Sequence, residues 1–318
     1  MTSTGRGIGI LAITFTSLLW GTTGAAATFA SGVSPLAIGS AALGIGGLLQ
    51  ALIALPSIGR ARAQLRLRPG LVVAGGLSVA VYPLAFYSSM HLAGVAIGSV
   101  VSLASAPLAA GLFERFIDRV ELSRWWLSAA GLGVVGSVAL CVAKVDSEPG
   151  ELSSTLAGIA LGLVAGASYA VYSWAARRLI AGGVPRAASM GAVFGLGGLL
   201  LMPVLLLTGA PLLASASNTL VAVYMALVPM FLGYLAFGFG LTRVSAGTAT
   251  TITLTEPAIA TVLAVLVVGE RLSAVGWTGL AVIGAAILVL AFAPTDRGDA
   301  GEQVDERSEG KKRLGVPT

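Results

Sequence analysis

The sequence predicts an all-α integral membrane protein with ten transmembrane helices arranged as two five-helix repeats of inverted topology. Three observations predict this class: the composition, the length of the apolar runs and similarity between the two halves. Of the 318 residues, 56% are hydrophobic and 10% are charged, and the mean hydropathy is +0.92. Soluble domains carry about 25% charged residues. The composition therefore excludes a cytosolic enzyme and a nucleic-acid-binding protein.

Runs of about 20 apolar residues, the length that an α-helix needs to cross the hydrocarbon core, predict ten spans. The spans cover approximately residues 7–29, 35–56, 70–90, 94–114, 124–143, 156–178, 186–207, 218–240, 246–268 and 274–293. Pro, Gly, Arg or acidic residues mark the breaks, as at Ser34-Pro35 and Gly269-Glu270-Arg271. The break from His91 to Gly94 is the weakest, but without it one helix would run from 70 to 114, so we expect two helices there.

Basic residues lie in alternate loops, and this asymmetry predicts the orientation. With the N-terminus inside, twelve basic residues face the cytoplasm, and Lys144 and Arg271 face outward. The cytoplasmic set is Arg6, Arg60, Arg62, Arg66, Arg68, Arg115, Arg119, Arg124, Arg177, Arg178, Arg186 and Arg243. The positive-inside rule therefore predicts a multi-pass protein of a bacterial plasma membrane with both termini cytoplasmic. We expect the first span to be retained, because its apolar run is longer than that of a signal peptide and further spans follow.

The chain divides into four predicted parts. Residues 1–8 form a cytoplasmic N-terminus, 9–143 and 156–293 form the two repeats, and 294–318 form a charged cytoplasmic tail. The tail has almost no large apolar residue, which predicts disorder. We expect it to be solvated, with binding to anionic lipid as the alternative.

Four short segments of the first half recur in the second half in the same order. At offsets of 148 to 151 residues, Gly44–Leu49 matches Gly195–Leu200, Leu84–Phe86 matches Leu235–Phe237, Ala106-Pro107 matches Glu256-Pro257, and Gly131–Gly136 matches Gly279–Gly284. Each match alone is weak, but collinear matches favour duplication. Each half holds an odd number of helices, so the second half enters the membrane from the opposite side. Inverted repeats of this kind are typical of alternating-access carriers.

Glu256 is the only acidic residue predicted near the middle of a span. A charge at that depth costs roughly 2.5–3.5 kcal/mol or more, so the carboxyl should face the bundle interior or a wet cavity. It is a candidate to carry a proton or to bind a substrate ammonium. The alternative is a protonated Glu256 that donates a hydrogen bond beside a kink at Pro257, whose missing N–H frees a carbonyl. A second kink is predicted at Pro107.

Two polar stripes accompany this acid. Thr250, Thr253 and Glu256 are spaced by three residues, close to one helical face, and could line a substrate path. The alternative, slightly favoured for the threonines, is that their hydroxyls bond back to carbonyls of their own helix. In the first half Ser99, Ser102 and Ser105 form a corresponding stripe, so Ser102 and Thr253 are candidates at the repeat interface.

Aromatic residues with a polar tip give the remaining cavity candidates. By depth, Trp20, Tyr82, Tyr169 and Tyr234 are the best of them. Tyr87, Tyr172 and Trp174 are further candidates, with the alternative that Tyr and Trp near helix ends are more often interfacial anchors. Trp125 and Trp126 follow Arg124 at a predicted cytoplasmic boundary, and we expect them to be anchors.

Two further features concern packing and the inner boundary. Gly158, Gly162 and Gly166 lie four residues apart and predict a face where helix backbones approach closely.

Glu114 lies at the inner end of the fourth span, where we expect a neutralising pair with Arg119, with a gate as the alternative.

The chain has few residues that could bind a metal or form a disulfide. The chain has one cysteine, Cys141, and one histidine, His91. They cannot form an internal disulfide or a multi-ligand metal site. An intramembrane enzyme would need a nucleophile and a base inside the spans. We therefore expect no cofactor, no metal site and no enzymatic activity.

Several of these features together resemble the EamA family of the drug/metabolite transporter superfamily. They are Trp20-Gly21 late in the first span, Thr255-Glu256-Pro257, Gly269-Glu270 before the last span, and the five-plus-five arrangement. The resemblance covers roughly residues 9–293. The first half departs from it, since Ala106-Pro107 lacks the acid and Val120-Glu121 replaces Gly-Glu. The resemblance implies secondary transport, commonly efflux, of small metabolites such as amino acids or of drug-like molecules.

The expected function is therefore secondary active export of such a small molecule, by alternating access about a central cavity near Glu256. The alternatives are a facilitator or channel, or a membrane scaffold subunit. The sequence has no ATP-binding motif, so an ion gradient, an exchanged solute or the substrate's own gradient must supply the energy. The expected partners are the substrate, the lipid bilayer and protons, a homodimer is left open, and nucleic acid is excluded.

Overall fold

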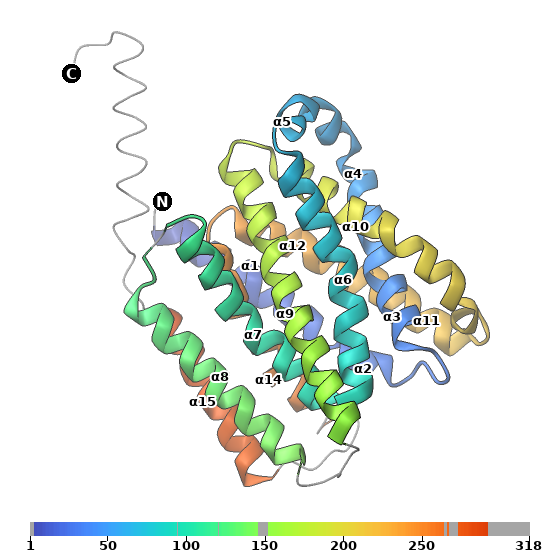
Figure 1. Cartoon of the computed structure of the whole chain (residues 1–318), viewed down its shortest axis with the longest axis vertical. Coiled ribbons are helices and arrows are strands. Elements are labelled where there is room, and N and C mark those ends of the chain that lie inside the picture. The colour runs from blue at the N-terminus through green and yellow to red at the C-terminus, as the bar shows by residue number, and fades with distance from the viewer. Residues whose placement is uncertain are drawn as a thin grey trace.

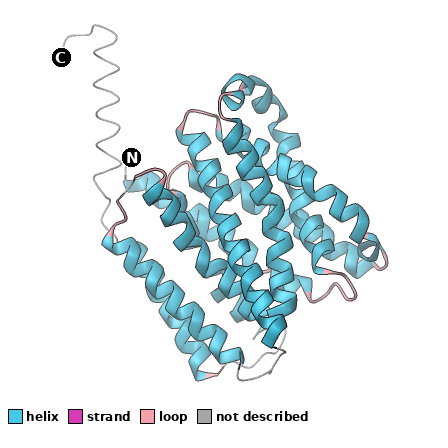
Figure 2. Cartoon of the chain, in the orientation of Figure 1, coloured by secondary structure: helices cyan, strands magenta, loops and turns pink. Residues whose placement is uncertain are grey.

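The computed structural model describes residues 3–93, 95–119, 121–145, 152–263, 266 and 273–291. Every secondary-structure element in these residues is a helix (Figure 2). The predicted tail over 294–318 and the predicted break at Gly269-Glu270-Arg271 lie outside the described residues. The all-helical class predicted from the sequence is confirmed for the part of the chain that the structure describes.

The helices follow the predicted spans closely. In chain order they are α1 (Ser3–Gly21), α2 (Thr23–Ala27), α3 (Pro35–Gly39), η1 (Ser40–Ile45), α4 (Gly46–Arg60), α5 (Arg62–Arg66), α6 (Pro69–Ala93), α7 (Val95–Phe116), α8 (Arg124–Val145), α9 (Leu152–Ala181), α10 (Arg186–Thr208), η2 (Ala210–Leu213), α11 (Ala216–Met225), η3 (Ala226–Leu232), α12 (Gly233–Leu241), α13 (Ala246–Ile252), α14 (Thr255–Leu263) and α15 (Ala274–Ala291). Of these, η1 and η3 are π-helices and η2 is a 3-10 helix.

Six helical stretches among the described residues are long and apolar enough to cross a membrane. They are Gly5–Ala27, Pro35–Arg60, Pro69–Ala93, Leu156–Ala181, Arg186–Thr208 and Ala216–Leu241. The remaining predicted spans contain α7, α8, α13 with α14, and α15. The chain is thus a multi-pass membrane protein.

Serine side chains cap the start of five of the described helices, at breaks between the predicted spans. Their hydroxyls accept hydrogen bonds from backbone N–H groups three residues further on, over 3.1 to 3.3 Å; the serines are Ser34, Ser123, Ser215, Ser245 and Ser273. Such an N-cap satisfies a donor that the first helical turn leaves free. Pro35 follows Ser34 at the first helical position, where its missing N–H removes no helical bond. Local chemistry therefore sets where these helices start.

The predicted glycine face on α9 is confirmed. α9 packs against α6 and α7 (Figure 1). A Cβ atom at Gly158 would collide with Ala93 of α6, and one at Gly166 would lie 2.5 Å from the Ser102 carbonyl oxygen of α7. The Ser89 hydroxyl also donates to the Gly158 carbonyl over 2.6 Å. The glycines of α9 allow its backbone to come close enough to α6 for an interhelical hydrogen bond.

Helices from the two halves of the chain pack against each other in a reciprocal way. α1 packs against α12 and α14, while α9 packs against α6 and α7. α4 packs against α10, and α8 lies beside α15 at one edge of the bundle (Figure 1). The similar segments Gly44–Leu49 and Gly195–Leu200 are in direct contact, since a Cβ at Gly198 would lie 2.7 Å from the Gly44 carbonyl oxygen. Both halves therefore contribute to the centre of the bundle.

Candidate functional site

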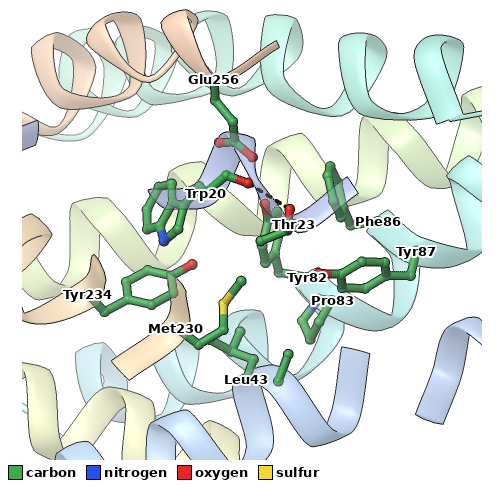
Figure 3. Close-up of a pocket in the computed structure, with 11 residues that line it drawn as sticks. Trp20, Thr23, Leu43, Tyr82, Pro83, Phe86, Tyr87, Met230, Tyr234 and Glu256 are labelled. Carbon is green, nitrogen blue, oxygen red and sulfur yellow. Dashed lines mark hydrogen bonds between the residues drawn. The ribbon is translucent and has the colours of Figure 1, made fainter. Parts of the chain in front are cut away.

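A small cavity inside the bundle brings together four of the residues predicted from the sequence. Trp20, Tyr82, Tyr234 and Glu256 all line it (Figure 3). They come from α1, α6, α12 and α14, so the lining combines elements that are distant in the sequence. The cavity has room for on the order of one water molecule. A larger molecule fits only if the surrounding side chains or helices separate.

Glu256 is the one charged side chain among the residues that line this cavity. It is 5% exposed, and its Oε2 atom has no hydrogen-bond partner among the described residues. In Figure 3 its carboxyl group points from α14 toward the aromatic side chains. A buried polar atom without a partner is rare, because its loss of hydration is not compensated. Its position next to a cavity offers an explanation, since a bound molecule could supply the missing partner.

The backbone turn before Glu256 positions this side chain. α13 ends at Ile252, Thr253 and Leu254 form a turn, and α14 begins at Thr255. The Glu256 N–H donates to the Thr253 carbonyl over 2.9 Å. In a continuous α-helix that carbonyl would pair with residue 257, which is a proline and has no N–H to give. The chain therefore interrupts the helix at the point where the proline would leave a carbonyl free.

The predicted disruption at Pro257 takes the form of a helix break rather than a bend. The break lies at Thr253 and Leu254, four and three residues before Pro257, which is the third residue of α14. Proline is well tolerated in a first helical turn. Pro107, the other predicted kink, lies within α7, which is one uninterrupted α-helix, and it does not line the cavity.

The threonine hydroxyls of α13 bond to carbonyls of their own helix, as the alternative interpretation predicted. Thr251 donates to the Gly247 carbonyl over 2.7 Å, and Thr253 donates to the Thr250 carbonyl over 2.9 Å. Thr253 has a second role, because its oxygen accepts a hydrogen bond from the Tyr169 hydroxyl over 2.9 Å. Thr253 and Tyr169 do not line the cavity, and this bond fixes α9 to the turn that precedes Glu256.

Trp20 and Gly21 perform different tasks at the same helix end. The Trp20 indole Nε1–H donates to the Pro229 carbonyl of η3 over 2.9 Å, which fixes the ring in the cavity wall. A Cβ at Gly21 would lie 2.6 Å from the Ile259 Cγ2 atom and 3.2 Å from the Glu256 carbonyl oxygen. Only a residue without a side chain allows α14 to approach α1 this closely. The Trp-Gly pair thus positions both the ring and the helix that carries the acid.

An aromatic cluster surrounds the cavity and continues behind it. The Trp20 ring centroid lies 4.6 Å from that of Tyr234 and 5.9 Å from that of Tyr169, and Tyr82 lies 5.7 Å from Tyr169. Behind this layer the Tyr172 and Tyr234 hydroxyls form a 2.8 Å hydrogen bond. Tyr169 therefore supports the cavity wall without lining the cavity.

Two of the further aromatic candidates are buried, and one expected anchor is buried instead of exposed. Tyr87 lines the cavity, and Tyr172 is bonded to Tyr234 behind it. Trp126 is 8% exposed, and a Cβ at Gly111 of α7 would collide with its ring. Trp125 is 46% exposed, which agrees with an anchor. Distance from a helix end is therefore an unreliable guide to burial in a bundle whose helices cross at an angle.

Ser102 does not belong to the site. Its hydroxyl donates to the Gly98 carbonyl over 2.7 Å, and its backbone lies against Gly166 of α9. The Ser105 hydroxyl bonds to the Ser102 carbonyl over 3.2 Å. The serine stripe therefore serves the contact between α7 and α9 and does not face Glu256 across a shared path.

At the predicted inner end of the bundle, acidic groups tie α7 to the second half of the chain. Glu114 Oε1 accepts the Gly247 backbone N–H over 2.9 Å, at the start of α13. The expected pair of Glu114 with Arg119 is therefore wrong. Asp118 pairs instead with Arg178 over 2.9 Å and accepts the Trp174 indole N–H over 2.9 Å.

Sequence reasoning missed several residues that line the cavity. Thr23, Leu43, Phe86 and Met230 also line it (Figure 3). Leu43 lies in η1 and Met230 in η3, so the π-helices η1 and η3 each contribute to the wall. π-helical segments occur frequently at functional sites. Pro229 within η3 was the available sequence signal, since a proline removes one helical hydrogen bond.

Comparison with known proteins relates the chain to membrane transporters. Residues 156–292 match the model of the EamA-like transporter family. The uncharacterized transporter YwfM of Bacillus subtilis is 30% identical over 286 residues, which is 89% of this chain and 94% of YwfM. An uncharacterized transporter of Clostridium kluyveri is 34% identical over 125 residues, which is 38% of this chain and 39% of that protein. One solved protein structure matches with a TM-score of 0.70 at 24% identity over 92% of this chain and 96% of its own, which shows the fold alone.

The fold and these relatives define a membrane transporter of the drug/metabolite transporter type and not an enzyme. Its partners are accordingly a small-molecule substrate and the lipid bilayer. The chain belongs to the EamA-like transporter family.

Proposed function

We propose that this chain is a secondary active transporter that exports a small metabolite across a bacterial plasma membrane by alternating access about the cavity at Glu256. The observation that carries the proposal is the Glu256 carboxyl, buried in an apolar bundle with an unpartnered oxygen at a cavity. An ionisable group inside a membrane is expensive and characteristically marks an ion or substrate pathway. Protons are the proposed coupling ion, with Glu256 as the carrier.

Reciprocal packing supports ten spans in two inverted repeats, 9–143 and 156–293. If α1 and α9 are the first helices of the two halves, each packs against the third and fourth spans of the other half, α12 with α14 and α6 with α7. The equivalent helices α4 and α10 pack together, as do α8 and α15. Contacts that repeat after the two halves are exchanged are expected from a two-fold relation. Two such halves can rock about a central site.

The size of the cavity supports a mechanism that includes conformational change. With room for about one water molecule, the space admits a metabolite only after the wall opens. Two π-helices in the wall, η1 and η3, together with Pro83 of α6, are places where helical hydrogen bonding is already altered. A static pore would need a continuous wet path, so the enclosed cavity favours a carrier over the alternative of a channel.

The remaining parts of the proposal come from the sequence. Charge asymmetry supports cytoplasmic termini, and the resemblance to the family supports export. The N-terminus 1–8, the tail 294–318 and the homodimer remain predictions. A membrane scaffold subunit without transport is the other alternative.

The test is solute counterflow in proteoliposomes with a panel of labelled zwitterionic, cationic and anionic metabolites, with and without an imposed pH gradient. We expect saturable flux of at least one solute, accelerated by the same solute on the opposite side. Glu256→Gln should abolish the response to the pH gradient, and the exposed Glu121→Gln should retain it. Linear flux would favour a channel, and no counterflow with any solute would favour a scaffold subunit.

A further inference from the structure

We infer that the cavity selects monovalent organic cations with an apolar body over zwitterions and anions. This inference rests on the proposed transport function and names the substrate class of the same site. It stands on the charge of the lining, the aromatic rings that enclose it and the engagement of its hydrogen-bond donors.

The charge of the lining favours a cation. Glu256 is an acid, and no Lys, Arg or His lines the cavity in the described part of the chain. Its Oε2 atom has no hydrogen-bond partner among those residues. A positively charged group can compensate an ionised carboxyl in an apolar interior, whereas an anion would meet it without any counter-charge. One acid balances one positive charge, so the expected charge of the substrate is +1.

The aromatic rings favour the same guest. Five lining residues are aromatic, and Figure 3 shows their rings grouped around the space that the Glu256 carboxyl faces: Trp20, Tyr82, Phe86, Tyr87 and Tyr234. Neighbouring rings are close together, with centroids 5.2 Å apart for Phe86 and Tyr87 and 5.5 Å apart for Tyr82 and Phe86. A cation within about 6 Å of a ring centroid is attracted by the negative face of the ring. The same rings provide an apolar surface for the body of the molecule.

The hydrogen-bond donors of the lining disfavour a substrate carboxylate. Trp20 Nε1 already donates to the Pro229 carbonyl over 2.9 Å, and the Thr23 hydroxyl donates to the Trp20 carbonyl over 2.7 Å. The Tyr234 hydroxyl shares a 2.8 Å hydrogen bond with Tyr172, in which either group can be the donor. A carboxylate that binds to Trp20 or Thr23 would have to displace one of their bonds beside an acidic side chain. A quaternary ammonium needs no donor, so it leaves this network intact.

A series of compounds that share one body and differ in charge tests the inference on the full-length chain in lipid nanodiscs. Phenethyltrimethylammonium is a permanent cation, phenylalanine a zwitterion and 3-phenylpropionate an anion. Isothermal titration should give a dissociation constant for the cation at least about tenfold below those of the other two. Equal or tighter binding of phenylalanine or phenylpropionate, or no binding of the cation, would overturn the inference.

Matched variants assign the selectivity to the cavity. Glu256→Gln should weaken binding of the cation by about tenfold or more, whereas Glu121→Gln should not change it. Tyr82→Phe, which keeps the ring, should bind the cation severalfold more tightly than Tyr82→Leu, which removes it. Trp277→Leu is the control for loss of an aromatic residue, because Trp277 is 53% exposed on α15. Unchanged binding in Glu256→Gln and in Tyr82→Leu would contradict the assignment, provided that both variants elute as single species and melt cooperatively.

The two proposals fail in different ways. If the substrate class is wrong, counterflow still occurs, but with a zwitterion or an anion. If the transport function is wrong, no solute gives counterflow, whether or not the cation binds.

Discussion

Two segments that match in sequence, one in α7 and one at the junction of α13 and α14, differ in both backbone and charge. At Ala106-Pro107 the helix α7 is uninterrupted, and Ala106 is 0% exposed. At Glu256-Pro257 the helix is interrupted by the turn at Thr253 and Leu254, and the acid faces the cavity. Similar halves can thus build one framework while a single half supplies its charge.

The difference also separates two uses of proline. In α7 the Ser102 and Ser105 hydroxyls bond to carbonyls of their own helix, and Pro107 lies within an uninterrupted helix. In the second half the turn satisfies the Thr253 carbonyl through the Glu256 N–H, and the proline begins the next helix. A broken helix directs a side chain inward without leaving buried backbone groups unsatisfied.

The largest effect should come from placing an acidic residue in the first half, at the position that corresponds to Glu256. Ala106→Glu places a carboxyl at a fully buried position, so we expect the free energy of unfolding to fall by roughly 3 kcal/mol or more. Denaturant titration in detergent measures this fall. A variant as stable as the wild type would mean that α7 can open a polar space of its own.

The next largest effect should come from the close contact between α1 and α14. A Cβ at Gly21 would lie 2.6 Å from Ile259 Cγ2, so Gly21→Ala should cost about 1–3 kcal/mol in the free energy of unfolding. Gly131→Ala is the matched control, because no atom lies within 4 Å of a Cβ there. The same titration compares them, and equal stability of the two variants would contradict the close approach.

Trp20→Phe should have a smaller effect. It keeps an aromatic ring but removes the hydrogen bond to the Pro229 carbonyl, for an expected loss of about 1–2 kcal/mol in the free energy of unfolding because that buried acceptor is left unpaired. Thermal melts of Trp20→Phe and of the exposed Trp277→Phe measure the difference. A variant of Trp20 that melts like the control would show that η3 does not depend on this bond.

The smallest effects should distinguish the threonines of α13. Thr253→Val removes the acceptor of the Tyr169 hydroxyl and should cost about 1 kcal/mol, whereas Thr251→Val removes only a bond within the helix and should cost less. Substrate affinity should change in neither variant, because neither residue lines the cavity. A loss of affinity in Thr251→Val would contradict this arrangement.

Much of the helical fold could be predicted from the sequence because its causes are local. Apolar runs of spanning length and capping residues such as Ser34 and Ser245 determine where helices begin. Polar groups deep in a span avoid the lipid and therefore face the interior of the bundle. For this reason the sequence predicted a shared cavity for Trp20, Tyr82, Tyr234 and Glu256. The contact between Gly44–Leu49 and Gly195–Leu200 agrees with their similarity.

What could not be predicted depends on tertiary packing. The π-helices η1 and η3 could not be predicted from the apolar runs, and a sequence signal, Pro229, was available for η3 alone. Glu114 binds a backbone N–H that lies 133 residues away in the chain. Almost every residue has a backbone N–H, so the residue types do not indicate which one Glu114 binds. Trp126 lies near a helix end but against Gly111 of α7, so its position in the sequence suggested exposure where the fold gives burial.

One half of the chain supplies the acidic side chain at a cavity that both halves line, and we propose that this side chain couples transport to a proton gradient. The most direct measurement is accumulation of a transported solute in proteoliposomes driven by an imposed pH gradient, for the wild type, Glu256→Gln and Glu121→Gln. We expect the wild type and Glu121→Gln to accumulate the solute above equilibrium, and Glu256→Gln only to equilibrate it. Accumulation by Glu256→Gln equal to that of the wild type would contradict the claim.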